Sequence, residues 1–262
     1  MNYFIEGFKE FQRAFSMRDT WLYLGLQDIK LRYRRSILGP WWLTISTAIM
    51  VIALGFLWSK IFLTDLKSYM PFFAVGYVFW TFILMQLTDS ITGFVQFENI
   101  IKQTKLPFPI FVFRLAVRNF IVLLHNFVVV LAVLFIVGDG LNWNALILIP
   151  AFILIYLLAI TTSIIVSIFC TRFRDLQQVV LSGLQIVFFF SPILWQPSSL
   201  KGSLQLISFN PVYHCLEIIR QPLLGFVPSL NNWLWVIGIL GLSFLTSIYL
   251  LGRYRSRIVF WL

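Results

Sequence analysis

The fold class is decided by residues 146–170, LILIPAFILIYLLAITTSIIVSIFC. This run contains no charged side chain. A helix of about 20 apolar residues crosses the ~30 Å hydrocarbon core of a bilayer. The run is therefore long enough to span a membrane, and it predicts an integral membrane protein.

The rest of the chain repeats this apolar pattern. Together with the first run, five further stretches predict six membrane spans, at about 41–63, 71–95, 109–137, 146–170, 179–195 and 233–251. Of the 262 residues, 60% are apolar and 11% are charged, whereas soluble domains are about 25% charged. This composition excludes a water-soluble globular protein and a disordered tail. We expect an all-α, polytopic protein that forms one domain over 1–262 and has no signal peptide.

The basic residues orient the predicted spans. Of the 20 Lys and Arg, 16 fall in segments on the same side as the N-terminus and 4 on the other side. The positive-inside rule therefore places both termini in the cytoplasm. Residues 1–40 form the cytoplasmic N-terminal segment, 41–251 the six-span core and 252–262 a cytoplasmic tail. The same rule accounts for the net charge of +10, so we expect no nucleic-acid partner.

The motifs of common catalytic and metal-binding sites are missing from the sequence. There is no DxxD or DxD cluster for a metal-bound diphosphate, no HExxH and no GxSxG. Cys170 and Cys215 fit no metal or redox spacing and are placed on opposite sides of the membrane. A GxxxxGK[ST] phosphate loop is also absent, so we expect no P-loop ATP hydrolysis. We predict no catalytic residue, no metal ligand and no cofactor in this chain.

An amphipathic helix is predicted at 21–37, WLYLGLQDIKLRYRRSI. Apolar residues follow one helical face: Leu22, Leu26, Ile29, Tyr33 and Ile37. Cations lie on and beside another face: Lys30, Arg32, Arg34 and Arg35. This pattern suits a helix in the membrane plane. The cations either touch lipid headgroups as an anchor or form a collar that grips a phosphate-bearing substrate, and the helix alone does not decide between these roles.

Few ionisable residues lie deep in the predicted spans. In the third span Arg114, Arg118 and His125 share one stripe, which serves either helix packing or function. Asp89 lies toward the inner end of the second span and is a candidate partner for one of these arginines. The scarcity of deep acidic residues disfavours a proton- or sodium-coupled transporter.

The 37-residue connection at 196–232 is too long to be a simple turn. Asn210-Pro211 predicts a helix start, and Pro222 ends that helix far short of a span. We expect a re-entrant helical hairpin that dips into the outer leaflet, either as a gate over an exit path or as a surface cap. The polar side of this helix carries His214, Glu217 and Arg220, of which the last two are candidates for an ion pair.

Five motifs match one family in type and order. They are QDIKLRYRRSILGPWW at 27–42, ENIIKQTKLPFP at 98–109, FRDL at 173–176, SPILW at 191–195 and NPVYHCLEIIR at 210–220. Over nearly its whole length, the chain resembles the permeases of type-2 ABC exporters for cell-surface polysaccharides. LRYRRSILGPWWLTI at 31–45 is most similar to the O-antigen branch of Gram-negative bacteria. The proline-bracketed KLPFP departs from the family, which more often has an aromatic residue before its first proline.

This resemblance implies a half-transporter. Two permease copies form a homodimer and assemble with two copies of a separate ABC ATPase subunit, which binds ATP and Mg. The implied substrate is an O-antigen-type polysaccharide of lipopolysaccharide, linked to undecaprenyl diphosphate. It moves from the cytoplasmic to the periplasmic side of the bacterial inner membrane, where the permease also contacts membrane lipids.

The resemblance also implies three functional helices. An ATPase-coupling helix maps onto about 97–106, with the candidate contacts Phe97, Glu98, Asn99, Ile100, Lys102 and Lys105. An interface, or gate, helix maps onto about 21–36, where the collar of Lys30, Arg32, Arg34 and Arg35 meets the diphosphate. The outer gate maps onto 210–222 and includes His214, Glu217 and Arg220.

Aromatic residues make up 18% of the chain. Sugars have apolar C–H faces that lie well against aromatic rings, and many weak contacts let a polymer slide. Conduit candidates lie toward the outer ends of the second and fifth spans: Phe72, Phe73, Tyr77, Trp80, Phe188, Phe189 and Trp195. The alternative is that most of these rings face lipid or pack in the core.

Three other functions stay open on the sequence. A related ABC permease for another lipid or a drug would share the six spans but lack the RYRRSILGPWW run. An integral membrane enzyme acting on lipid-linked sugars would need a carboxylate site, and none is found. A structural membrane-interaction protein is disfavoured by the gate-like hairpin.

Overall fold

The computed structural model describes residues 3–34, 36–39, 41–197 and 207–262. The described part is all helical and contains no strand, which confirms the predicted all-α polytopic fold. Its first helices are α1 (Tyr3–Ser16), α2 (Arg18–Arg32), α3 (Trp41–Ile61), α4 (Leu66–Ile91), η1 (Val95–Phe97), α5 (Glu98–Gln103) and α6 (Pro109–Ile136). They are followed by η2 (Trp143–Ile147), α7 (Leu148–Arg172), α8 (Leu176–Phe190), α10 (Pro211–Leu223) and α11 (Leu230–Trp261).

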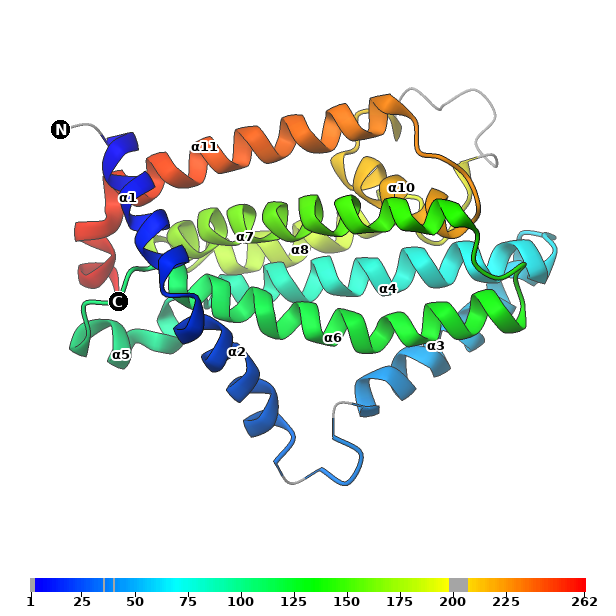
Figure 1. The fold of residues 1–262 in the computed structure, drawn as a ribbon, viewed down its shortest axis with the longest axis horizontal. Coiled ribbons are helices and arrows are strands. Elements are labelled where there is room, and N and C mark those ends of the chain that lie inside the picture. Colours follow the sequence, from blue (N-terminus) through cyan, green and yellow to red (C-terminus); the bar gives the residue numbers. More distant parts are fainter. Residues whose placement is uncertain (1–2, 35, 40, 198–206) are drawn as a thin grey trace.

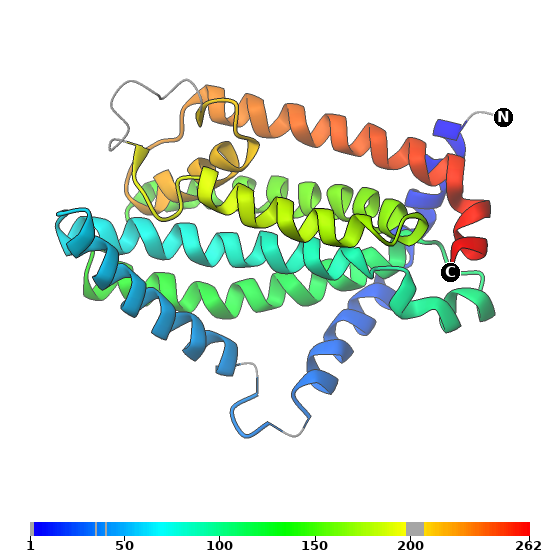
Figure 2. The same ribbon diagram turned by 180° about the vertical axis from the view of Figure 1, so that it is seen from behind.

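The long helices form one elongated bundle with two different ends (Figures 1 and 2). The first end, called the terminal end below, holds α1, α5 and the C-terminal turns of α11. The opposite end, called the α10 end, holds α10 and the turns that join α3 to α4 and α6 to α7. Both ends of the chain lie at the terminal end.

Five of the described helices are long and apolar enough to cross a membrane: α3, α4, α6, α7 together with η2, and α11. The predicted span at 179–195 differs, because α8 begins at Leu176 and ends at Phe190 after 15 residues. At 1.5 Å per residue it is about 22 Å long, shorter than a ~30 Å hydrocarbon core. The helix stops at Ser191, since the following Pro192 disfavours helical backbone before it.

The last span is longer than predicted. Helix α11 starts at Leu230 and continues to Trp261, so most of the predicted tail at 252–262 forms its final turns. Ser229 caps its start by accepting a hydrogen bond from the Asn232 backbone N–H at 3.4 Å. The turns beside α10 need glycine, because Gly140 and Gly225 have φ of 80° and 88°.

Helix α1 is an element that the sequence analysis did not predict. It crosses α11 where Gly7 meets Gly252, and its buried face also includes Glu10 and Ala14. A Cβ atom on Gly252 would lie 1.8 Å from the Tyr3 carbonyl oxygen, and one on Gly7 would lie 1.9 Å from the Ile248 carbonyl oxygen. Only glycine therefore permits these two backbones to touch.

The bundle core is centred on α4 and α6, which pack against each other along the middle of the molecule. Helix α3 lies at one side of the bundle and packs on both of them. Helix α8 lies along α4 and α7 (Figure 2). This arrangement leaves the outer face of α3 exposed, including Ile49, Ile52 and Phe56.

The glycine crossing yields a stability prediction. Gly252→Ala should lower the thermal unfolding midpoint of the detergent-solubilised protein, because the added methyl forces α1 away from α11. Overpacking of this kind costs about 1–3 kcal/mol. The matched control is Gly241→Ala on the same helix, where a Cβ meets nothing within 4 Å. Equal midpoints for the two variants would contradict the close crossing.

Candidate functional site

The cations of α6 are paired inside the bundle. The Arg114 Nε donates to Asp28 Oδ2 of α2 at 2.6 Å, and a second Arg114 nitrogen donates to the other carboxylate oxygen. Arg118 Nη2 donates to Asp89 Oδ2 of α4 at 2.5 Å. The predicted pairing of Asp89 with an α6 arginine is thus confirmed. Both arginines serve helix packing, which was one of the two interpretations of their stripe.

A buried hydrogen-bond network continues from this pair into α7. The Asn119 side chain donates to Gln86 Oε1 and to the Asp89 carboxylate, both at 2.9 Å. Gln86 Nε2 donates to Ser163 Oγ at 2.9 Å. Each buried polar group of this network therefore has a partner from another helix, as a membrane interior demands.

Helix α2 packs on α6, a contact that the sequence did not predict. Its packed residues are Trp21, Leu24, Gly25 and Asp28. Leu22 and Leu26, from the predicted apolar stripe, are 39% and 49% exposed. A Cβ atom on Gly25 would lie 2.9 Å from the Arg114 carbonyl oxygen, so glycine sets this contact. The helix ends at Arg32, which corrects the prediction that it continues to 37.

The collar residues lie where α2 leads toward α3. Lys30, Arg32 and Arg34 are exposed, and none of the ion pairs between described residues involves them. Arg35 lies outside the described residues. In both views α2 runs away from the bundle and α3 returns to it, so the connection between them lies beside the bundle, between its two ends (Figures 1 and 2). The collar is therefore set deeper along the bundle than the terminal end.

The predicted coupling segment forms a short helix at the terminal end. It consists of η1 and α5. Phe97 is 8% exposed, stacks on Phe111 with ring centroids 5.3 Å apart, and lies 4.5 Å from the Arg114 guanidinium. Its side chain thus supports the helix from within. Glu98 pairs with Lys102 at 2.6 Å. The other candidate contacts are exposed: Asn99, Ile100, Lys102 and Lys105.

Helix α10 begins as predicted at Asn210, whose side chain accepts a hydrogen bond from the Val212 N–H at 2.9 Å. The polar side of the helix, however, does not face water. His214, Glu217 and Arg220 are all buried, because α10 packs against α4, α7 and α11 inside the bundle. This burial also argues against a plain surface cap. The connecting residues 198–206 lie outside the described part of the chain.

Arg220 is buried inside the bundle at the α10 end. It is 1% exposed, pairs with Glu217 at 3.2 Å and donates to the Pro192 carbonyl at 2.8 Å. Its guanidinium lies 3.8 Å from the centroid of the Phe72 ring. A Cβ on Gly76 would lie 2.3 Å from Arg220 Nη2, so Gly76 makes room for it. The expected Glu217–Arg220 ion pair is therefore confirmed within α10, and Arg220 itself packs on Phe72 and Gly76 of α4.

His214 fixes the other side of α10. Its two ring nitrogens lie 2.8 Å from Asn232 Oδ1 and 2.8 Å from the Ser208 carbonyl oxygen. The ring also stacks on Trp235 of α11, with centroids 5.0 Å apart. Of the predicted gate residues, Arg220 thus contacts α4 and His214 contacts α11.

The seven conduit candidates divide by burial. Phe72, Phe73 and Trp80 are buried within the protomer, which supports the packing interpretation for them. Tyr77, Phe188 and Trp195 are half-buried, and Trp80 lies against Phe188 with centroids 5.5 Å apart. Phe189 is 65% exposed.

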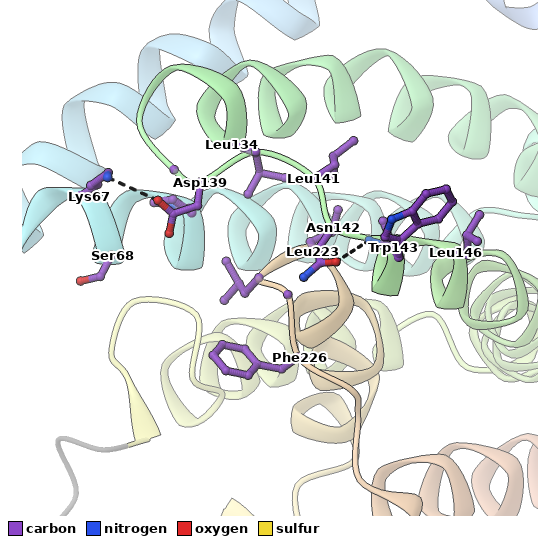
Figure 3. Close-up of a pocket in the computed structure, with 16 residues that line it drawn as sticks. Lys67, Ser68, Leu134, Asp139, Leu141, Asn142, Trp143, Leu146, Leu223 and Phe226 are labelled. Atoms are coloured by element: carbon purple, nitrogen blue, oxygen red, sulfur yellow. Dashed lines mark hydrogen bonds and ion pairs between the residues drawn. The ribbon is translucent and has the colours of Figure 1, made fainter.

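A cavity of about 880 Å³, which the sequence did not predict, opens at the α10 end. Its walls come from the start of α4, the connection of α6 to α7 and the turn after α10 (Figure 3). Lys67 and Asp139 pair across its rim at 3.3 Å, and the rings of Trp143 and Phe226 line it. Gly140 and Gly225, the two glycines with positive φ described above, line this cavity. Such glycines are the sequence signal that could have indicated tight turns here.

No cluster of His, Cys, Asp or Glu among the described residues could hold a metal ion. Cys170 and Cys215 are buried free thiols.

Comparison with known proteins gives consistent matches. A model of the ABC-2 type transporter family matches residues 20–224. The O-antigen export system permease protein RfbA of Klebsiella pneumoniae is 24% identical over 230 residues, which cover 86% of this chain and 83% of that protein. A second Klebsiella pneumoniae protein of this name is 25% identical over 71% of this chain and 73% of its own. The protein of the same name from Myxococcus xanthus is 22% identical over 75% and 79%, respectively.

The buried ion pair of α10 can be tested by substitution. Glu217→Gln should lower the thermal unfolding midpoint strongly, because it leaves the Arg220 charge buried without a carboxylate, a loss of about 3–5 kcal/mol. The matched control is Asp139→Asn, which breaks the exposed pair with Lys67 and should cost at most about 1 kcal/mol. Similar midpoints for both variants would show that α10 is not held by this pair.

Proposed function

Because the chain belongs to the ABC-2 type transporter family, we propose that it is the permease of an ATP-driven exporter of O-antigen-type polysaccharide. The matched proteins that carry an O-antigen export permease name support this cargo. We further propose that the polysaccharide is linked to undecaprenyl diphosphate and moves from the cytoplasmic to the periplasmic side of a bacterial inner membrane. In this orientation the terminal end of the bundle is cytoplasmic, as its basic residues favour.

The observation that carries this proposal is the state of the collar. Arg114, Arg118 and Arg220 each have a carboxylate partner, whereas Lys30, Arg32 and Arg34 are exposed and unpaired among the described residues. Cations placed between the ends of a membrane-spanning bundle are costly in lipid. They therefore need water or an anionic ligand. A diphosphate entering beside α6 supplies that charge and suits both the guanidinium fork and the lysine ammonium.

We propose that the working assembly holds two copies of this permease and two copies of a separate ABC ATPase, which binds the ATP and Mg. The broad apolar face of α3 supports a homodimer, since only 28% of the apolar 18-residue stretch of this helix is buried within one chain. The exposed side of α5 offers Asn99, Ile100, Lys102 and Lys105 to the ATPase. These contacts are consistent with a coupling helix at the terminal end.

A line of contacts joins the coupling helix to the collar. Phe97 touches the Arg114 guanidinium, and Arg114 holds Asp28 of α2. Lys30, Arg32 and Arg34 follow Asp28 by two to six residues. Movement of α5 when the ATPase closes is therefore passed through Arg114 to the helix that carries the collar. This connection explains how hydrolysis in another subunit can reposition cations that hold the cargo.

Export is tested by deleting the gene and restoring it on a plasmid. The wild-type gene should restore surface glycan, and the triple variant Lys30→Gln, Arg32→Gln, Arg34→Gln should restore roughly tenfold less, the change expected for ~1.4 kcal/mol of lost phosphate contact. The matched control is the triple variant Lys9→Gln, Arg13→Gln, Arg18→Gln, which removes three exposed cations of α1 and α2 near the terminal end. This variant should restore surface glycan like the wild-type gene. Unchanged glycan in the collar variant would contradict headgroup binding. Unchanged glycan in the deletion strain would indicate a different lipid or drug cargo.

Coupling is tested with Asp28→Ala in the purified permease–ATPase complex. Loss of the Arg114 pair should leave ATP hydrolysis in place while export in cells falls severalfold, because α2 no longer follows α5. Asp19→Ala, which removes an exposed carboxylate from the same helix, is the matched control. Proportional loss of hydrolysis and export would contradict a purely coupling role. The permease without its ATPase should hydrolyse no ATP.

A further inference from the structure

A second cavity, of about 210 Å³, lies inside the bundle between α3, α4 and α6. It is separate from the cavity at the α10 end and shares no lining residue with it. Its polar lining comes from near the middle of the long helices, with Thr81 on α4 and Asn126 on α6. Ser46 and Met50 of α3 line it and are exposed, so it communicates with the outside of the protomer.

Asn126 is the clearest sign that this cavity takes a ligand. Its side chain is 6% exposed, and its buried Oδ1 has no hydrogen-bond partner among the described residues. Asn119, two turns earlier on the same face of α6, is instead fully engaged by Gln86 and Asp89. Buried polar groups in native proteins are nearly always satisfied, so an orphaned amide in a membrane span calls for a missing partner.

Two more polar groups in the same cavity lack a protein partner. Neither the Thr47 hydroxyl of α3 nor the Tyr77 hydroxyl of α4 makes a hydrogen bond to another described residue, although both residues line the cavity. Thr162 and Thr81 instead bond to their own helices, to the Leu158 carbonyl at 2.7 Å and the Val78 carbonyl at 2.7 Å, whereas the buried Thr44 hydroxyl of α3 also lacks a partner among the described residues. Three helices thus each present one free hydrogen-bonding group to one space.

We propose that this cavity binds a sugar ring of the cargo through Asn126, Thr47 and Tyr77. This inference rests on the proposed export function and names residues that contact the glycan. A hydroxyl-rich ligand both donates and accepts, so it can satisfy the amide, the threonine and the phenol together. A purely apolar ligand would leave all three unpaired, and an ionic ligand would find no charged residue in the lining. The Tyr77 ring adds an apolar face for sugar C–H groups.

The size of the cavity fits this ligand. At ~30 Å³ for each water molecule, about seven waters fill the space, and one pyranose ring of similar bulk replaces them. A single ring held by three neutral groups is bound weakly, which suits a polymer that must keep moving. Of the seven aromatic conduit candidates, Tyr77 is the one that lines this cavity.

The first test is export by Asn126→Leu in the deletion strain. Leu replaces the polar amide with an apolar side chain of similar size. We therefore expect at least threefold less surface glycan and no decrease in the thermal unfolding midpoint. Asn126→Thr, which returns a hydroxyl to the cavity, should recover part of the export. Normal export by Asn126→Leu would overturn the sugar site.

The second test measures occupancy directly. Thr47→Cys is labelled in cells with 2-aminoethyl methanethiosulfonate, with the buried Cys170 and Cys215 of the parent chain setting the background. We expect labelling in a host that cannot start glycan synthesis, and at least threefold slower labelling in a host that makes the glycan. The matched control is Thr162→Cys on α7, outside the cavity, which should give the same rate in both hosts.

The outcomes separate the cavity from the function. Equal labelling of Thr47→Cys in both hosts would show a water-filled cavity, and no labelling in either host would show a closed one; each result overturns the sugar site. If deletion of the gene abolishes surface glycan while Asn126→Leu exports normally, only the sugar site fails. If deletion leaves surface glycan unchanged, the proposed function fails and the sugar site fails with it.

Discussion

The ion pair between Arg114 and Asp28 is the contact on which the terminal half of the molecule depends. It holds α2 against α6 at a place where Gly25 lets the two backbones approach. The Phe97 ring lies on the same guanidinium, so α5 is tied to this point as well. Removing either charge would leave the other poorly solvated inside a membrane domain, which makes the pair hard to dispense with. One side chain of α6 therefore positions both α5 and α2, the proposed coupling helix and the helix that bears the collar.

The same demand for pairing explains why the unpaired groups stand out. Asp89, Gln86 and Asn119 satisfy one another across α4 and α6, and Arg220 has partners from three segments of the chain. Against this background, the exposed collar cations lack an ion-pair partner among the described residues, and the buried Oδ1 of Asn126 in the α3–α4–α6 cavity lacks a hydrogen-bond partner there. Native proteins break such local rules mainly at functional sites. In the proposed transporter the collar cations meet the charged lipid anchor and the Asn126 amide meets neutral sugar.

Hydropathy was sufficient to predict the long spans, because a bilayer imposes their length, and the Asn210-Pro211 start of α10 followed from local capping. The packed face of α2 could not be predicted, because Gly25 and Asp28 contact a distant part of the chain on α6. Asp28 and its partner Arg114 are 86 residues apart in the sequence. The burial of Arg220 depends on Phe72 and Pro192, which only the tertiary fold brings to it. Helix α1 could not be predicted because charged residues such as Glu10 interrupt its apolar face. Glu10 is buried, and its Oε1 accepts a hydrogen bond from the Phe108 backbone N–H at 3.3 Å.

The two ends of the bundle are built for different tasks. At the α10 end, Arg220 packs on Phe72 of α4 and donates to the Pro192 carbonyl, and His214 contacts Asn232 of α11, so α10 cannot shift without breaking buried contacts on both sides. At the other end, α2 is held to α6 mainly near Arg114, and the chain beyond Asp28 diverges from the bundle (Figure 1). Movement driven from α5 therefore reaches α2 and the collar more easily than it reaches α10. In the proposed exporter, this asymmetry would let the entrance respond to the ATPase while the exit side keeps its structure until the cargo reaches it.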